Sequence, residues 1–212
     1  MKNIIFVAAP AAGKGTFSDM LQDKYGYVHI STGDLLRKAK NEDSELGKEI
    51  ASLMNSGSLV PDEIVLELLS NYIKEIGTSK KFILDGVPRN VNQIEAVLNI
   101  VGDDYVVVFL DVDYDKAMKR TLGRLTCPKC NKGYNKYSLE FRPKVDGICD
   151  NCGIELVARS DDNEETFKIR FDTYMNETRE VLDYFKKINR LATIKVTDIA
   201  ADDIKEIERV IE

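Results

Sequence analysis

The chain begins with a short apolar run that leads directly into a loop containing glycine and lysine. Residues 4–7 read Ile-Ile-Phe-Val, and residues 8–16 read Ala-Ala-Pro-Ala-Ala-Gly-Lys-Gly-Thr. A polar and apolar pattern typical of a helix follows. A buried strand, a tight loop and a helix in this order place consecutive backbone N–H groups at a helix N-terminus, where the helix dipole favours an anion.

The loop fits only the second half of the phosphate-binding loop pattern. That pattern has a glycine five residues before the Gly-Lys pair, and this chain has Ala8 there, whereas Gly13 to Thr16 fit in full. Lys14 supplies a charge for terminal phosphates, and the Thr16 hydroxyl could bind Mg²⁺ or cap a backbone donor. An alanine-rich strand-to-helix turn without a ligand is the alternative.

Five apolar segments are predicted to form strands, with helical stretches between most of them: residues 3–7, 28–31, 81–84, 105–111 and 193–196. This alternation predicts an α/β fold with a doubly wound parallel sheet. In such a sheet functional residues gather beyond the carboxyl ends of the strands. Those ends carry residues 8–16, 32–37, 85–89 and 111, so we expect these segments to converge.

Composition excludes several classes of protein. With 43% hydrophobic and 31% charged residues among 212, the chain is typical of a globular protein. No apolar run approaches the roughly 20 residues that span a bilayer, and the first residues lack the form of a signal peptide. We therefore expect no membrane association and a cytoplasmic location. The net charge of −6 argues against a nucleic-acid partner.

All four cysteines lie in a segment without helical periodicity, between residues 122 and 157. Cys127 and Cys130 form one Cys-x-x-Cys pair, and Cys149 and Cys152 form another. Their spacing is typical of a structural four-cysteine zinc site, and a segment so poor in apolar residues needs metal to fold. Free or redox-active thiols are the alternative. The single histidine, His29, is expected to pack in the core.

Several further motifs follow one another in a specific order. Residues 29–37 read His-Ile-Ser-Thr-Gly-Asp-Leu-Leu-Arg, residues 57–63 read Gly-Ser-Leu-Val-Pro-Asp-Glu, and residues 84–89 read Leu-Asp-Gly-Val-Pro-Arg. Arg-Ser-Asp-Asp follows at 159–162. With these motifs the chain resembles the adenylate kinases, a family of P-loop nucleoside monophosphate kinases, in the long form that has a zinc-binding lid. The resemblance runs from about residue 1 to residue 196.

The resemblance implies a fold and an activity. It implies a five-stranded core formed by residues 1–30, 60–121 and 160–212, a small helical AMP-binding insert at 31–59, and a zinc-binding lid at 122–159. The implied reaction is reversible, Mg²⁺-dependent phosphoryl transfer that converts ATP and AMP to two ADP, with lid closure excluding water. ATP, AMP and ADP are the implied ligands, and a monomer is the implied state.

The resemblance also implies site residues. For ATP these are Ala11, Ala12, Gly13, Lys14, Gly15, Thr16, Arg120 and Arg124. For AMP they are Thr32, Arg37, Ser58, Leu59, Val60, Gly86, Arg89, Gln93, Arg159 and Arg170. The catalytic residues are Lys14, Asp85, Arg89, Arg124, Arg159 and Arg170, and the zinc ligands are Cys127, Cys130, Cys149 and Cys152. Arginine is the residue best suited to hold phosphates bidentately.

The chain departs from the family pattern at several positions, of which Ala8 and Ala11, in place of glycines, matter most. A left-handed backbone costs a non-glycine residue about 1–2 kcal/mol, so two such penalties falling on binding would weaken ATP roughly 30-fold to 10³-fold. Two alternatives therefore remain open. One is a kinase for another nucleoside monophosphate, and the other is a nucleotide-binding protein with weak catalysis.

Overall fold

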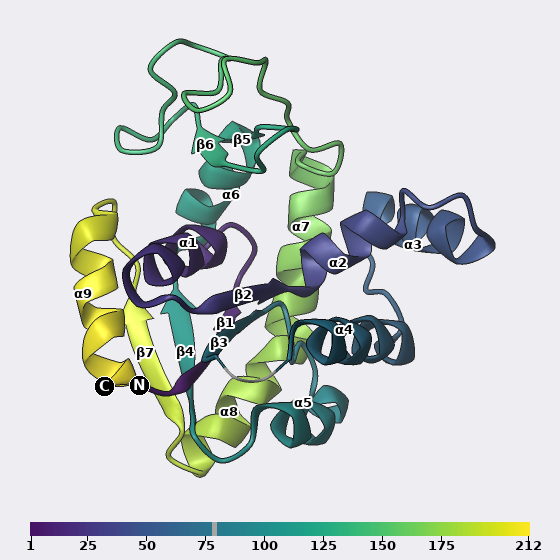
Figure 1. The fold of residues 1–212 in the computed structure, drawn as a ribbon, viewed down its shortest axis with the longest axis vertical. Helices are drawn as coiled ribbons and strands as arrows, with labels where there is room; N and C mark the ends of the chain where they lie inside the picture. The colour runs from purple at the N-terminus through teal and green to yellow at the C-terminus, as the bar shows by residue number, and fades with distance from the viewer. Residues whose placement is uncertain (78–79) are drawn as a thin grey trace.

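A computed structural model describes residues 1–77 and 80–212, and five parallel strands form its centre (Figure 1). The strands are β1 (Asn3–Ala8), β2 (Val28–Ser31), β3 (Phe82–Asp85), β4 (Tyr105–Asp111) and β7 (Leu191–Lys195). Their order across the sheet is β2-β3-β1-β4-β7, and every pairing is parallel. The predicted doubly wound parallel sheet is confirmed.

Helices connect the strands in chain order. They are α1 (Lys14–Tyr25), α2 (Thr32–Ala39), α3 (Glu45–Ser56), α4 (Asp62–Ile76), the 3₁₀ turn η1 (Val91–Gln93), α5 (Ile94–Val101), α6 (Tyr114–Gly123), α7 (Glu164–Thr173), the π-helical turn η2 (Tyr174–Thr178), α8 (Arg179–Lys187) and α9 (Ala200–Ile211). None of the helices described is long and apolar enough to cross a membrane.

Alternating side chains of β1 pack into two separate apolar layers. Ile4 and Phe6 belong to the layer formed with α1, α6, α7 and α9. Ile5 and Val7 belong to the layer formed with α2 to α5 and α8. Successive residues of a strand point to opposite faces, so both faces of the sheet are buried. This explains the uninterrupted apolar run at the start of the chain.

The strands differ slightly from the segments predicted. β3 begins and ends one residue later than expected, and β7 covers residues 191–195 instead of 193–196. The early start of β7 follows from its ladder with β4, in which Leu191 pairs with Val107. Hydrogen bonding to a neighbouring strand sets these ends, and the residue pattern of one strand alone does not reveal that pairing.

The cysteine-containing segment projects beyond the sheet as loops around a small hairpin (Figure 1). The hairpin pairs β5 (Arg124–Thr126) with β6 (Gly133–Asn135) in an antiparallel ladder, and Thr126 also bridges to Val157. The hairpin follows α6, and α7 begins a few residues after the segment ends. The segment is therefore attached to the core through two helices.

Candidate functional site

A cavity of about 820 Å³ opens at the carboxyl ends of the strands. It is lined by the loop after β1, the start of α2, the loop after β3 and the cysteine-containing segment. All the predicted nucleotide-site residues except Thr32 and Gln93 line it. Those two line a small adjoining cavity of about 20 Å³, which shares Leu59, Val60 and Arg89 with the large one. The structure thus brings the predicted residues together.

The two alanines of the phosphate-binding loop differ in backbone conformation. Ala11 has φ 57°, in the left-handed region that costs a residue with a side chain about 1–2 kcal/mol. Ala8 is the last residue of β1 and pairs with Leu110 in the ladder, so it carries no such cost. Gly13, at φ 104°, precedes α1. The cost of a left-handed backbone, which the sequence suggested for both alanines, therefore applies to Ala11 alone.

Lys14, at the start of α1, lies opposite a carboxylate at the end of β3. Its Nζ is 3.8 Å from Asp85 Oδ1, and His29 Nε2 is 3.5 Å from Asp85 Oδ2. Burial would raise the pKa of Asp85, but Lys14 and His29 outweigh burial and lower it. Burial also lowers the pKa of Lys14, against the opposing effect of Asp85. The Asp85 carboxylate is thus held ionised between Lys14 and His29.

His29 was expected to pack in the apolar core, but it does not. Its ring lines the large cavity. Burial would lower the pKa of His29, but the approach of Asp85 and other nearby carboxylates raises it. The prediction was wrong because β2 lies at the edge of the sheet, where a side chain can face the functional cavity. Neither the position of β2 nor the partner of His29 can be deduced from a local sequence pattern.

Two arginines at the sides of the cavity are held by adjacent acids. Arg124 forms a bidentate pair with Asp162, with Nε 2.7 Å from Oδ2, and the Arg170 guanidinium pairs with Asp161. Burial would raise the pKa of Asp161, but Arg170 outweighs burial and lowers it. These pairs orient both guanidinium groups and leave some of their five N–H donors for other acceptors.

Arg159 differs from these two because no carboxylate pairs with it among the described residues. Burial, and then repulsion from Arg124 and Arg37, lowers the pKa of Arg159 to about 10. Arg89 is close enough to Arg170 and Arg37 for both to lower its pKa too, after burial. These guanidinium cations repel one another, and a polyanion bound between them would stabilise the cluster.

The loop after β3 is built around a close backbone approach. Gly86 has φ 94°, and a Cβ there would lie 2.4 Å from Thr32 Oγ1. The Thr32 hydroxyl donates to the carbonyl of Asp85 at 3.2 Å. Only glycine therefore fits between the ends of β2 and β3 at this point. The resulting turn directs Arg89 to the cavity.

At the other end of the cavity, the cysteine-containing segment meets the core. The Arg120 guanidinium donates to the carbonyl of Thr197 at 2.7 Å, and the Asn135 amide donates to the carbonyl of Arg120 at 2.7 Å. Glu140 accepts from the backbone N–H of Ala200, the first residue of α9, at 3.0 Å. Neither Asn135, the last residue of β6, nor Glu140, in the loop after β6, belongs to a sequence motif, and neither was predicted.

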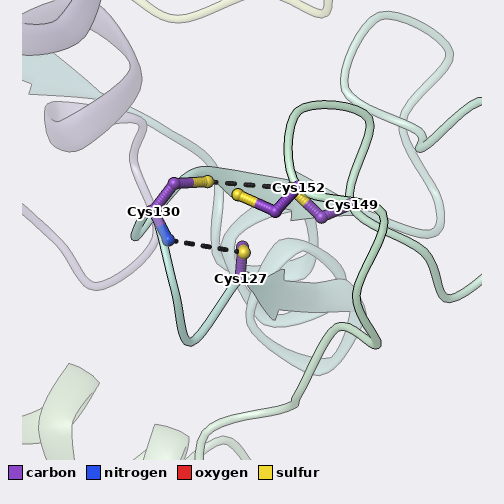
Figure 2. Close-up of side chains that lie close together, drawn as sticks. All are labelled: Cys127, Cys130, Cys149 and Cys152. Carbon is purple, nitrogen blue, oxygen red and sulfur yellow. Dashed lines mark hydrogen bonds between the residues drawn. The ribbon is translucent and has the colours of Figure 1, made fainter.

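The four cysteines converge on one point (Figure 2). Their Sγ atoms all lie within 4.8 Å of one another, and none forms a disulfide. The Cys130 and Cys149 Sγ atoms are 3.7 Å apart. A tetrahedral zinc with bonds of about 2.3 Å separates its sulfur ligands by about 3.8 Å. The cluster therefore fits a four-coordinate metal with no open position.

Comparison with known proteins identifies the family to which this sequence is similar. The family model described as Adenylate kinase matches residues 6–190. An adenylate kinase of Thermotoga neapolitana is 40% identical over 98% of this chain and 97% of its own. Adenylate kinases of Thermodesulfovibrio yellowstonii and Borreliella burgdorferi are 43% and 38% identical, over 92% and 95% of this chain and 91% and 96% of their own.

Proposed function

The chain belongs to the adenylate kinase family, and we propose on this premise which of its residues bind the two nucleotides and transfer the phosphoryl group. The family assignment confirms the adenylate kinase function expected from the sequence.

The grouping of Lys14, Arg124, Arg159 and Arg170 around one cavity supports their role in holding the transferring phosphoryl group. Arg159 carries most of this argument, since it has no carboxylate partner among the described residues and its pKa is lowered to about 10. Negative charge spread over the transferring oxygens would relieve that repulsion. Phosphoryl transfer depends mainly on positioning and charge neutralisation, so no general base is required.

We assign the ATP end of the cavity to the loop after β1. Residues 11–16 line the cavity next to Arg120 and Arg124, and the backbone N–H groups at the start of α1 suit phosphate oxygens. We assign the AMP end to Thr32, Arg37, Arg89 and Gln93, with residues 58–60 and Gly86 beside them. Arg37 and Arg89 come from different strand ends and would clasp one phosphate from two sides.

The residues near Lys14 fit a magnesium ion that accompanies ATP. Thr16 lines the cavity and offers a hydroxyl, and Asp85 is held ionised by its neighbours. Oxygen ligands and bound waters are what Mg²⁺ prefers. Bound there, Mg²⁺ would neutralise charge on the donor phosphates, while Lys14 keeps the phosphates in position.

We propose that residues 122–159 form a lid on the core, that residues 31–59 form the AMP-binding insert, and that the remaining residues stay fixed. Zinc at the four cysteines would hold the lid in shape, since the cluster is closed and has no position for substrate. Contacts between lid and core at Asn135 and Glu140 support closure over the donor site. A closed lid excludes water that would hydrolyse ATP.

We further propose that the protein works as a cytoplasmic monomer. A single chain supplies the lining of the cavity, so the site needs no partner to complete it. Four unbridged cysteines gathered for a metal suit a reducing compartment.

A coupled assay of ADP formation tests these assignments. ATP and Mg²⁺ are supplied with AMP, and with CMP, UMP and GMP in parallel, to protein checked for one zinc per chain. We expect turnover with AMP to exceed turnover with the other acceptors. Turnover confined to another acceptor would overturn the assignment of the AMP-end residues, and binding of both nucleotides without turnover would overturn the proposed catalytic roles.

A further inference from the structure

A network of hydrogen bonds behind the AMP end of the cavity fixes the side-chain amide of Gln93. The Gln93 Oε1 accepts from the backbone N–H of Arg89 at 2.7 Å. The Gln93 Nε2 donates to Asp62 Oδ1 at 2.6 Å. The side chain is buried, with 2% of its surface exposed, and it lines the small cavity together with Leu36, Val60 and Val65.

The two contacts demand the same orientation of the amide. A backbone N–H can only donate, so it requires the oxygen of Gln93, and a carboxylate accepts, so it requires the nitrogen. Turning the amide over would place two donors together at Arg89 and two acceptors together at Asp62. Each unsatisfied buried group costs more than a hydrogen bond contributes. The orientation is therefore determined twice, and Asp62 supplies half of the restraint.

Asp62 is in turn held by Asn90. The Asn90 Nδ2 lies 3.1 Å from both carboxylate oxygens of Asp62, and the Asn90 Oδ1 accepts from the backbone N–H of Gln93 at 3.2 Å. Asn90 thus caps the turn η1 that carries Gln93 and steadies the carboxylate that orients Gln93. Asp62 itself is the first residue of α4, so α4 and η1 are fixed to each other at this point.

After these contacts, Gln93 keeps one lone pair on Oε1 and one hydrogen on Nε2, and no other described residue takes them. A carbonyl beside an N–H pairs with a base edge that offers an amino group beside a ring nitrogen acceptor. Adenine and cytosine have that edge. Guanine and uracil carry the reverse, a carbonyl beside a ring N–H, and would require the amide to be turned over.

We infer that Asp62 is a specificity-determining positioning residue, which selects amino bases over oxo bases at the acceptor site by holding the Gln93 amide in one orientation. This inference rests on the proposed assignment of Gln93 to the AMP end. AMP and GMP are both purines that present opposite edges to the amide, although guanine also carries a 2-amino group. CMP and UMP differ only in that edge and have bases with equal numbers of heavy atoms, so this second pair controls for size.

The test is the ratio of kcat/KM for AMP to that for GMP, with ATP as donor. In Asp62→Asn, one carboxylate oxygen becomes an N–H₂ group that faces donors and no longer enforces the orientation. Since one hydrogen bond is lost from the restraint, we expect the ratio to fall about tenfold, with KM for ATP unchanged. Glu63→Gln removes the same charge from the same helix turn, at an exposed position, and is expected to leave the ratio within about twofold.

Asn90→Asp provides a second variant if Asp62→Asn does not fold. It keeps an oxygen to cap η1 but places a carboxylate against Asp62, and we expect it to lower the same ratio. Wild-type protein provides a third readout, because the fixed amide favours CMP over UMP. An unchanged AMP-to-GMP ratio in folded variants, or a preference for UMP over CMP, would overturn the inference. If wild-type protein failed to use AMP at all, the proposed function would fail instead.

Discussion

The core and the cysteine-containing lid of this chain are stabilised by different means. The core buries two extensive apolar layers on the two faces of its sheet. The buried apolar cluster of the lid consists of Cys127, Tyr134, Cys149 and Leu156, and two of these four are candidate metal ligands. A segment with so little apolar burial cannot offset the entropy of ordering its backbone. We therefore expect the core to fold by packing and the lid to depend on metal bound at its four cysteines.

Lys14→Met tests the core side of this comparison and has the largest expected effect on activity. The lysine lines the cavity and its Nζ lies 3.8 Å from Asp85 Oδ1, so we expect it to contribute charge to the reaction more than stability to the fold. Loss of one charge at developing negative charge typically lowers kcat about 10²–10³-fold. We expect that loss in the coupled assay, with a melting temperature close to wild type. A large drop in melting temperature would show instead that Lys14 is structural.

Cys127→Ser tests the lid side and is expected to lower turnover less than tenfold. The thiol is fully buried and belongs to the cluster, so its loss opens a closed metal site. Zinc content should fall below one per chain, and the melting temperature should drop by several degrees. Metal analysis and calorimetry check this outcome. A loss of turnover equal to that of Lys14→Met, with unchanged stability, would contradict a structural metal.

A matched pair of alanine variants tests strain in the phosphate-binding loop. Ala11→Gly removes the strain of a left-handed residue with φ 57°, which stabilises the folded state by about 1–2 kcal/mol. Glycine also gives the unfolded chain more conformational freedom, which offsets about 0.4–1 kcal/mol of that stabilisation. We expect a neutral to slightly higher melting temperature. Ala8→Gly acts within β1 and should cost about 0.5–1 kcal/mol. Equal shifts in thermal unfolding for both variants would contradict the conformational difference between them.

The pH dependence of stability has the smallest expected effect. The pKa of His29 is raised because the contact with Asp85 and other nearby carboxylates outweighs the lowering by burial. A raised pKa stabilises the fold fully below the unfolded value of about 6.5, and this contribution disappears as pH rises through the folded pKa. Without nucleotide or Mg²⁺, the melting temperature of wild-type protein should fall over that window relative to His29→Gln. Parallel curves would show that the contact contributes nothing.

The sequence predicted the sheet and the location of the cavity because both depend on local patterns that repeat. Apolar runs identify buried parallel strands, and the ends of such strands meet at one edge. Lys14, Asp85 and Arg89 were found in this way. The grouping of the four cysteines into one candidate metal site also followed from their spacing alone.

What the sequence could not supply were contacts between segments far apart in the chain. The orientation of Gln93 depends on Asp62, and the second partner of Asp85 is His29 on another strand. The lid contact of Glu140 with α9 spans 60 positions. Such contacts depend on three-dimensional proximity, and no periodicity marks them. Residue type likewise could not distinguish the left-handed Ala11 from the extended Ala8, because both are alanines.

Amide hydrogen exchange during removal of metal by a chelator tests the central difference between core and lid most directly. Exchange reports local opening residue by residue, so both regions are measured in one molecule at once. We expect amides between Cys127 and Cys152 to lose protection as zinc leaves, while those of β1 and β4 stay protected. Protection that persists in the lid without metal, or is lost equally in the core, would contradict the account.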